Sequence, residues 1–288
     1  MGEPKNHHYV SRCHIKNFFN KTEKKIYLFD KLKDNFYFSE SSKNIFSENY
    51  LNSRLDNGII DNTTLERELQ VKFEDHFNRI TELIEDFDTN ILKNNEETIK
   101  ALYRLTLYGL IGDLRNPNHK KEKDDFLKSV LDKLIEISAN ELSAQIQQQR
   151  NEYDKTKYIN GLNYFEIATI HLEKMGELDF TIYIINSDDI FLLPDTSSIC
   201  YKAKINEYFN PDIYEKAMVG IPLTSKIYIH AESKKLPNTS NRVIRINGND
   251  NKIVAAINKD IYEQSFKTVA ACDESKLSVI INKIKGSV

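Results

Sequence analysis

The sequence predicts an α+β protein: an N-terminal β-hairpin, a central bundle of about four helices and a C-terminal, strand-rich mixed sheet. Two patterns support this. Apolar residues recur every three or four positions over about 60–176, whereas short β-branched runs dominate about 177–288. Helices and strands segregated along a chain favour α+β over a wound parallel sheet. Because no linker rich in Pro, Gly or Ser separates the halves, we expect one domain over 1–288.

The composition is that of an ordinary folded protein. Of the 288 residues, 40% are hydrophobic and 10% aromatic, which is enough for a substantial core. The 40 basic and 43 acidic residues give a formal charge of −3, so nucleic-acid binding would need a local basic patch. Without a run of 18 apolar residues, no membrane span is expected. Cys13, Cys200 and Cys272 form no CxxC pair, which predicts reduced thiols and a cytoplasmic location.

The hairpin is expected near the N-terminus. Residues 25–30 and 35–38 are rich in Ile, Tyr, Leu and Phe, as β-strands often are. Asp34-Asn35 between them supplies the turn chemistry. We expect this hairpin to join the C-terminal sheet.

The first helix is expected over 64–93, where an apolar stripe runs along one face. Thr63 and Glu66 match a capping box, in which each side chain accepts a hydrogen bond from a free backbone N–H at the helix start. The second helix, about 96–114, should end before Pro117, because proline disfavours helix in the preceding residue.

Two more helices complete the helical half. One is expected over about 122–150 and the other over 163–175, with Gly176 at a left-handed C-cap. The C-terminal half contains short strand-like runs followed by a helical stretch over about 250–265, and the segment 276–285 is ambiguous between helix and strand. The expected strands are 180–185, 190–194, 226–231 and 241–247.

Three histidines, an arginine and a cysteine lie within H-H-Y-V-S-R-C-H, residues 7–14. In an extended segment His8 and His14 would share one face, and His7 and Cys13 the other, because side chains alternate. Two imidazoles on one face can ligate a metal, or act as an acid and a base near neutral pH. Histidines near an N-terminus are also often exposed and without a role, and this alternative stays open.

Two further polar residues stand where chemistry could occur. Asp195 follows an apolar run and opens a polar turn, a position that suits catalysis or metal binding but also an ordinary turn. Arg115 follows the second helix and can grip a phosphate or carboxylate in a bidentate way, or interact favourably with the helix dipole. The sequence contains no GxGxxG, GxxxxGK[ST], GxSxG or HExxH, which argues against P-loop, Rossmann and α/β-hydrolase sites. The locally basic N-terminal segment can form a phosphate-attracting patch with Arg115 if the fold brings them together.

Several short motifs follow one another in a distinctive order. They are H-H-Y-V-S-R-C-H-I-K-N-F, then Leu65-Glu66 with Glu74, Leu114-Arg115-Asn116-Pro117, Phe191-Leu192-Leu193-Pro194-Asp195-Thr196 and Ile221-Pro222-Leu223-Thr224, and then Asn258. In this order the chain resembles the DUF4238 family of bacterial proteins, which begin with H-Y-V-P-R-x-x-L-x-x-F and carry F-I-T-S-D-N-P and P-L-S/T. Ser11 replaces the proline of the first motif, and Leu193-Pro194-Asp195-Thr196 replaces its Thr-Ser-Asp-Asn.

The family name implies no activity, but the resemblance selects five polar residues. They are His8, Arg12, Arg115, Asp195 and Asn258, which fall on its motifs. Because these residues are far apart in the sequence, the fold would have to bring them together to form a site.

The first functional hypothesis is a phosphodiester hydrolase. His8, Asp195 and Asn258 would be catalytic, with His8 as acid or base and Asp195 as base or metal ligand, while Arg12 and Arg115 would bind the phosphate of the substrate. The substrate would be a nucleic acid or a nucleotide. A divalent metal fits this chemistry as a cofactor, although the sequence does not identify one. A nuclease or nucleotide hydrolase of this kind would suit a defence or toxin effector against phage.

The second hypothesis is a binding module without catalysis. Here the HHYV segment is an edge strand, Asp195 caps a turn and Arg115 closes a helix. The helical half then presents a surface to a protein partner. The sequence leaves the oligomeric state open.

Overall fold

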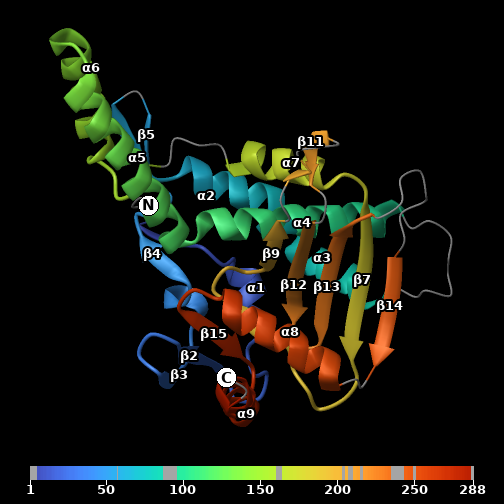
Figure 1. The fold of residues 1–288 in the computed structure, drawn as a ribbon. Coiled ribbons are helices and arrows are strands. Elements are labelled where there is room, and N and C mark those ends of the chain that lie inside the picture. Colours follow the sequence, from blue (N-terminus) through green and yellow to red (C-terminus); the bar gives the residue numbers. More distant parts are fainter. Residues whose placement is uncertain are drawn as a thin grey trace.

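The computed structural model in Figure 1 shows the α+β architecture that the sequence predicts, with an N-terminal hairpin, a group of helices and a C-terminal mixed sheet. The structure describes residues 5–56, 58–86, 96–159, 164–202, 205–206, 210–214, 217–234, 243–248 and 251–286.

A five-stranded mixed sheet forms the centre of the C-terminal half. Its strand order is β14-β7-β13-β12-β9, and only the β14–β7 pair is parallel. The expected strand regions 180–185, 226–231 and 241–247 lie in it, although residues 241–242 fall outside the described residues. The strands are β7 (Leu178–Ile185), β9 (Ile199–Lys202), β12 (Ala217–Thr224), β13 (Ile227–Ser233) and β14 (Val243–Gly248).

Helices cover both faces of this sheet. Side chains alternate along each strand, so each strand contributes apolar residues to a core on either face. On β13, Ile227 and Ile229 face a core shared with helices α2, α3, α4 and α7, whereas Tyr228 faces a second core shared with α8. Figure 1 shows α3 and α4 behind the sheet and α8 in front of it. These helices are α2 (Thr64–Leu69), α3 (Asp75–Glu85), α4 (Glu96–Arg115), α7 (Tyr164–Met175) and α8 (Asn251–Gln264).

The predicted hairpin is present and pairs with a C-terminal strand, but in a separate four-stranded sheet of order β3-β2-β15-β8. Asp34 has φ +51°, as a turn residue between its strands often does. The strand expected over 190–194 shrinks to the two residues of β8. The elements are β2 (Ile26–Asp30), β3 (Asn35–Ser39), β8 (Leu193–Pro194), β15 (Thr268–Ala271) and α9 (Glu274–Gly286), which settles the ambiguous 276–285 segment as a helix.

The first predicted helix is interrupted and shorter than expected. A π-helical turn, η2 (Gln70–Glu74), joins α2 to α3, which ends at Glu85; residues 87–93 lie outside the described part of the chain. The predicted capping box is wrong. Asp61 Oδ1 accepts hydrogen bonds from the N–H of Thr63 and Thr64, while the Glu66 carboxylate accepts one from Asn52 Nδ2, 2.5 Å away. A nearer acceptor at the helix start frees Glu66 for a tertiary contact.

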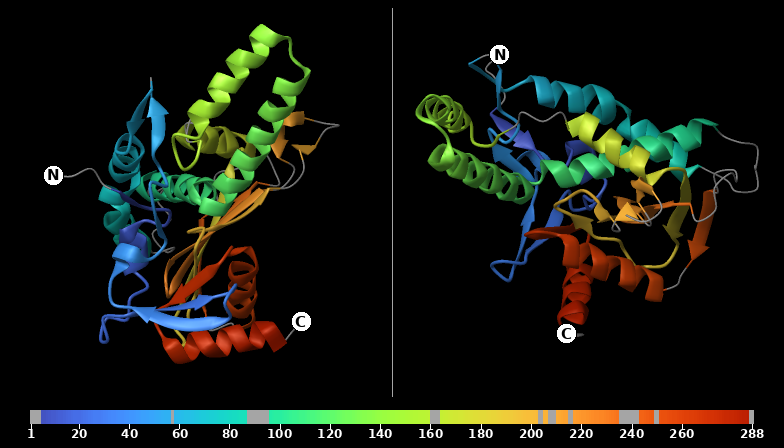
Figure 2. Two further views of the ribbon diagram at one scale, coloured as in Figure 1. Left: turned by 90° about the vertical axis from the view of Figure 1, so that its left-hand side faces the viewer. Right: turned by 45° about the horizontal axis from the view of Figure 1, so that its top comes forward.

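The helix predicted over 122–150 is two helices, α5 (Pro117–Ile137) and α6 (Asn140–Tyr153). Ser138 and Ala139 between them are extended, with ψ near 150°, and they form the tight loop of a helical hairpin. Figures 1 and 2 show this hairpin, here called the α5–α6 arm, standing away from the rest of the molecule. No residue of α6 is buried, and only Lys120 and Asp124 near the start of α5 are.

The other helical predictions are confirmed. Helix α4 covers the second and α7 the fourth, with Gly176 at φ +70°, as a left-handed C-cap requires. Helix α8 covers the segment 250–265 apart from its ends.

The N-terminal segment is not extended throughout, so the predicted common face of His8 and His14 is wrong. Strand β1 (Asn6–His8) gives way to helix α1 (Arg12–Lys16). The His14 ring is buried against Phe18, Phe77 and Tyr108, and its Nε2 donates a hydrogen bond to the carbonyl of Pro222 at 2.6 Å. A buried, doubly partnered ring of this kind belongs to the core.

Small elements complete the N-terminal and central regions. Strand β1 pairs antiparallel with β4, β5 with β6, and β10 with β11. They are η1 (Ser42–Asn44), β4 (Ser47–Asn49), β5 (Arg54–Asp56), β6 (Ile59–Asp61), β10 (Ile205–Asn206) and β11 (Asn210–Tyr214).

In the described part of the chain, no helix has the combination of length and apolarity that crossing a bilayer demands. All three cysteines are free thiols, as their spacing predicted.

Candidate functional site

The five residues that the motifs select, here called the motif network, are connected through hydrogen bonds, most of them to backbone groups. The Arg115 guanidinium donates to the carbonyl of His8. The next residue, Asn116, donates from Nδ2 to the carbonyl of Asp195 at 3.3 Å. Arg12 joins His8 through Ser42, and Asn258 holds the segment that leads to Asp195, as detailed below.

His8 ends β1, which pairs with β4, and its side chain is buried. Its Nε2 lies 3.0 Å from the carbonyl oxygen of Ser42. A carbonyl only accepts, so Nε2 carries the proton and Nδ1 has the lone pair. Burial lowers the pKa of His8, against the raising effects of the Ser42 carbonyl and Glu66. His8 is therefore neutral at pH 7, and Nδ1 is its basic atom.

The two arginines differ sharply in their environment. The Arg12 side chain is exposed, with Nε 3.5 Å from Ser42 Oγ. Arg115 is only 1% exposed, and its Nε has no hydrogen-bond partner among the described residues. No carboxylate of the described part of the chain forms an ion pair with it. Arg115 therefore carries a buried positive charge, which donates a hydrogen bond to the His8 carbonyl.

Asp195 lies just after β8 and is 2% exposed. Its Oδ1 accepts from the N–H of Phe266 at 2.9 Å, and Oδ2 accepts from Lys267 at 2.7 Å and Thr268 at 2.9 Å. Burial raises the pKa of Asp195, while these three N–H donors and the Lys31 ammonium lower it. Both oxygens of the carboxylate therefore accept backbone hydrogen bonds that order the turn leading into β15.

Asn258, on α8, is also committed to the backbone. Its Oδ1 accepts from the N–H of Leu192 at 2.9 Å, and its Nδ2 donates to the carbonyl of Ile190 at 2.8 Å. The segment 190–194 is buried but largely outside regular sheet pairing, so these bonds satisfy backbone groups that a strand partner would otherwise satisfy.

The loop after Asp195 is fitted closely to α4. Ser197 has φ +63°, and a Cβ added to Gly112 would overlap both Ser197 Oγ and the carbonyl of Thr196. Ser198 Oγ donates to the carbonyl of Gly109 at 2.7 Å. Only glycine at position 112 lets this loop approach the helix so closely.

A polar cluster next to the motif network escaped the sequence analysis. Lys120 is buried, and its Nζ donates to the Leu51 carbonyl and to Asn52 Oδ1, both at 2.9 Å. Burial and the neighbouring Arg115 charge hold the pKa of Lys120 well below its usual value. The N–H of Asn52 donates to His7 Nδ1 at 2.9 Å. No short motif announces these contacts, because they join residues more than 40 positions apart.

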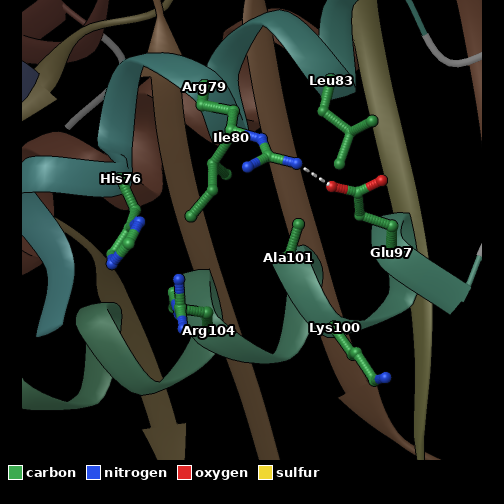
Figure 3. Close-up of a pocket in the computed structure, with 8 residues that line it drawn as sticks. All are labelled: His76, Arg79, Ile80, Leu83, Glu97, Lys100, Ala101 and Arg104. Carbon is green, nitrogen blue, oxygen red and sulfur yellow. Dashed lines mark hydrogen bonds and ion pairs between the residues drawn. The ribbon is translucent and has the colours of Figure 1, made fainter.

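A pocket of about 250 Å³ lies between α3 and α4 (Figure 3). Helix α3 contributes His76, Arg79, Ile80 and Leu83. Helix α4 contributes Glu97, Lys100, Ala101 and Arg104. The spacing i, i+3, i+4, i+7 recurs in both sets, which places each set on one face of its helix. In the sequence, this spacing is the only indication of the pocket, and the same spacing is typical of any helix face.

The motif network brings the predicted residues into one connected frame. Asp195 and Asn258 direct their polar atoms at the backbone, and Arg115 at His8; only His8 Nδ1 and the exposed Arg12 offer groups to a ligand. Within the described ranges, no three His, Cys, Asp or Glu side chains gather closely enough to hold a metal ion.

A family model described as "Protein of unknown function (DUF4238)" matches residues 6–275. No curated protein and no solved structure matches the chain significantly.

Proposed function

Because the chain belongs to the DUF4238 family, whose description states no function, we propose a function from the geometry: a non-catalytic interaction module that binds a second copy of itself through the α5–α6 arm. One observation carries the proposal. The arm contributes no buried apolar side chain to the body, yet Phe126 is 71% and Ile137 78% exposed on it. Exposed apolar side chains on a projecting element are typical of interaction surfaces.

The exposed apolar residues of α5 form a stripe. Phe126, Leu134 and Ile137 are exposed at helical spacing, while Val130, Leu131 and Ile135 are half-buried. Two helical hairpins with such stripes can pack into a four-helix bundle, which buries the stripe of each. A second copy supplies the matching stripe without any further partner.

The motif network supports the non-catalytic part of the proposal. A general base or a metal ligand needs a lone pair directed at the substrate or ion. Asp195 spends both oxygens on three backbone N–H groups, and Asn258 spends both amide atoms on the 190–192 segment. In this proposal, Asp195 and Asn258 have a structural role: they hold the turn before β15 and the 190–192 segment in place by hydrogen bonds.

Sedimentation equilibrium tests the proposed self-association. We expect wild type to form dimers at concentrations of about 100 μM or below, as for a modest interface. Phe126→Glu/Ile137→Glu should be monomeric, because it places four carboxylates in the dimer seam. Val279→Glu is the matched control, since Val279 is 51% exposed on α9, which lies at the opposite end of the molecule from the arm in Figure 1. A monomeric wild type, or dimers that survive the arm substitutions, would contradict the proposal.

The phosphodiester hydrolase stays a second candidate, favoured by one feature: His8 Nε2 and the Nε of the exposed Arg12 both contact Ser42, so the His8 ring, with its lone pair on Nδ1, lies near an arginine. A neutral imidazole with a free lone pair beside an arginine suits general-base attack on a phosphodiester of a nucleic acid or nucleotide. A role as nuclease, nucleotide hydrolase or phage-defence effector depends on this candidate. Hydrolysis of nucleic acids or nucleotides, with and without divalent metals, that is lost in His8→Ala but kept in His7→Ala would establish it.

We also propose that residues 1–288 form one domain. Its support is that one apolar core contains residues of α2–α4 and of β7, β12 and β13, so the helical and strand-rich halves share it. A cytoplasmic location remains a proposal that rests on the three free thiols.

A further inference from the structure

The geometry points to an anion-binding site in the pocket between α3 and α4, and we propose that it takes a small phosphate monoester with a compact apolar group. The proposal is independent of the arm and of the motif network, because none of its residues belongs to either. It rests on which charges in the pocket are already paired, on how the two helix faces oppose each other and on the nature of the pocket floor.

Cationic groups outnumber carboxylates in the pocket. Arg79, Lys100 and Arg104 line it, whereas Glu97 is the one carboxylate among its lining residues. Arg79 pairs with Glu97 at 2.5 Å, and Lys100 pairs with Glu96, one turn earlier on α4, at 2.7 Å. Arg104 has no ion pair within the described residues. The pocket therefore keeps one cationic group whose charge is not compensated.

The unpaired Arg104 does not stand alone. Helices α3 and α4 run antiparallel, so His76, the first lining residue of α3, lies opposite Arg104, the last of α4. Figure 3 shows these two side chains pointing toward each other across the gap, at the end of the pocket away from the Arg79–Glu97 pair. The Arg104 guanidinium and the His76 imidazole can both donate hydrogen bonds to an anion bound between them, and no carboxylate of the pocket lining lies there.

The floor of the pocket is apolar. Ile80, Leu83 and Ala101 point into the space between the helices, as Figure 3 shows. A guanidinium presents two parallel N–H groups that match two oxygens of a phosphate, and an imidazole adds a third donor. A ligand with a phosphate at one end and a few carbons at the other satisfies both parts, and about 250 Å³ is room for one small molecule.

Isothermal titration with phenyl phosphate at low ionic strength tests the site. We expect saturable one-to-one binding to the full chain, weaker binding of inorganic phosphate and none of phenol. Arg104→Gln should weaken phenyl phosphate binding about tenfold, the scale of one charge-assisted pair. His76→Gln should weaken it by less. Arg67→Gln is the matched control, because Arg67 is an exposed arginine on α2 outside the pocket, and it should leave the affinity unchanged.

Each contrary result would overturn a part of the proposal. The site is wrong if phenyl phosphate does not saturate the chain, or if Arg104→Gln binds it as tightly as wild type does. An equal loss in Arg67→Gln would mean diffuse attraction to a basic surface. If inorganic phosphate bound as tightly as phenyl phosphate, the apolar floor would contribute nothing to ligand binding, and that part of the proposal would be wrong. Circular dichroism of each variant shows whether the fold is kept, which the exposure of Arg104 leads us to expect.

Discussion

The motif network and the α3–α4 pocket use polar residues in opposite ways. In the motif network, Asp195 and Asn258 are buried and meet backbone groups at 2.7–2.9 Å. In the pocket, Arg104 and His76 face a gap with no ion-pair partner in the described chain. The comparison teaches that short sequence motifs can mark the contacts that specify a fold, while a binding surface can arise from two helix faces that carry no motif.

The largest expected effect is on the motif network. Asp195→Ala removes the acceptor of three buried N–H groups, each of which costs about 1–3 kcal/mol when unsatisfied. We expect the free energy of unfolding in urea to fall by about 4 kcal/mol. Asp188→Ala, at an exposed aspartate, should change it by less than about 0.5 kcal/mol. If the two variants had similar free energies of unfolding, Asp195 would not stabilise the fold as the motif network requires.

A pH titration extends the comparison to His14, another histidine of the N-terminal segment. Burial lowers its pKa from 6.5 to about 4. Between these values the unfolded chain binds a proton that the folded chain does not, so stability is full above pH 6.5 and falls as the pH drops toward 4. The loss should be about 3 kcal/mol.

The measurement is the free energy of unfolding from pH 7 to pH 4 for wild type and for His14→Gln. The variant should lack this part of the pH dependence although it is less stable at pH 7. Parallel curves for the two proteins would mean that His14 is not the group responsible.

Gly112→Ala tests how closely the loop after Asp195 fits α4. The added methyl group would collide with Ser197 Oγ and the Thr196 carbonyl, and overpacking of this kind costs about 1–3 kcal/mol. We expect a loss of about 2 kcal/mol in urea unfolding. Gly286→Ala is a control, since a Cβ there meets nothing within 4 Å. A neutral Gly112→Ala would show that the loop is looser than described.

The smallest effect on stability is expected in the pocket. Arg104 is exposed and unpaired in the described chain, so Arg104→Gln should change the free energy of unfolding by less than about 0.5 kcal/mol. A loss above about 1.5 kcal/mol in thermal or urea unfolding would place Arg104 in the framework of the fold.

Local sequence patterns predicted those elements well whose conformation depends on interactions between residues close in the sequence. The α4 stripe, the left-handed Gly176 and the Asp34 turn are all set by neighbours within a few residues. The break at Ser138 was missed, because the apolar pattern runs on through it and the loop is stabilised by α6 packing back on α5. The capping box failed for a related reason, since Glu66 is drawn to Asn52, 14 positions earlier.

The motif residues could be selected from the sequence, but what they do could not. Their partners are backbone groups up to 107 positions away, as with Arg115 and His8, and no local pattern encodes such pairs. The same holds for Lys120, which is buried through contacts 68 and 69 positions distant. The pocket needed the antiparallel pairing of α3 and α4, which brings His76 to Arg104.

One measurement tests the contrast directly: urea unfolding of Asp195→Asn and Arg104→Gln, each with and without saturating phenyl phosphate. A ligand that binds the folded state raises the free energy of unfolding. We predict that Asp195→Asn is less stable by about 2 kcal/mol but is still stabilised by the ligand, since it loses acceptors for buried N–H groups and keeps the pocket. Arg104→Gln should keep its stability and lose the response to the ligand. The reverse pattern, with a ligand response lost in Asp195→Asn and kept in Arg104→Gln, would contradict the account.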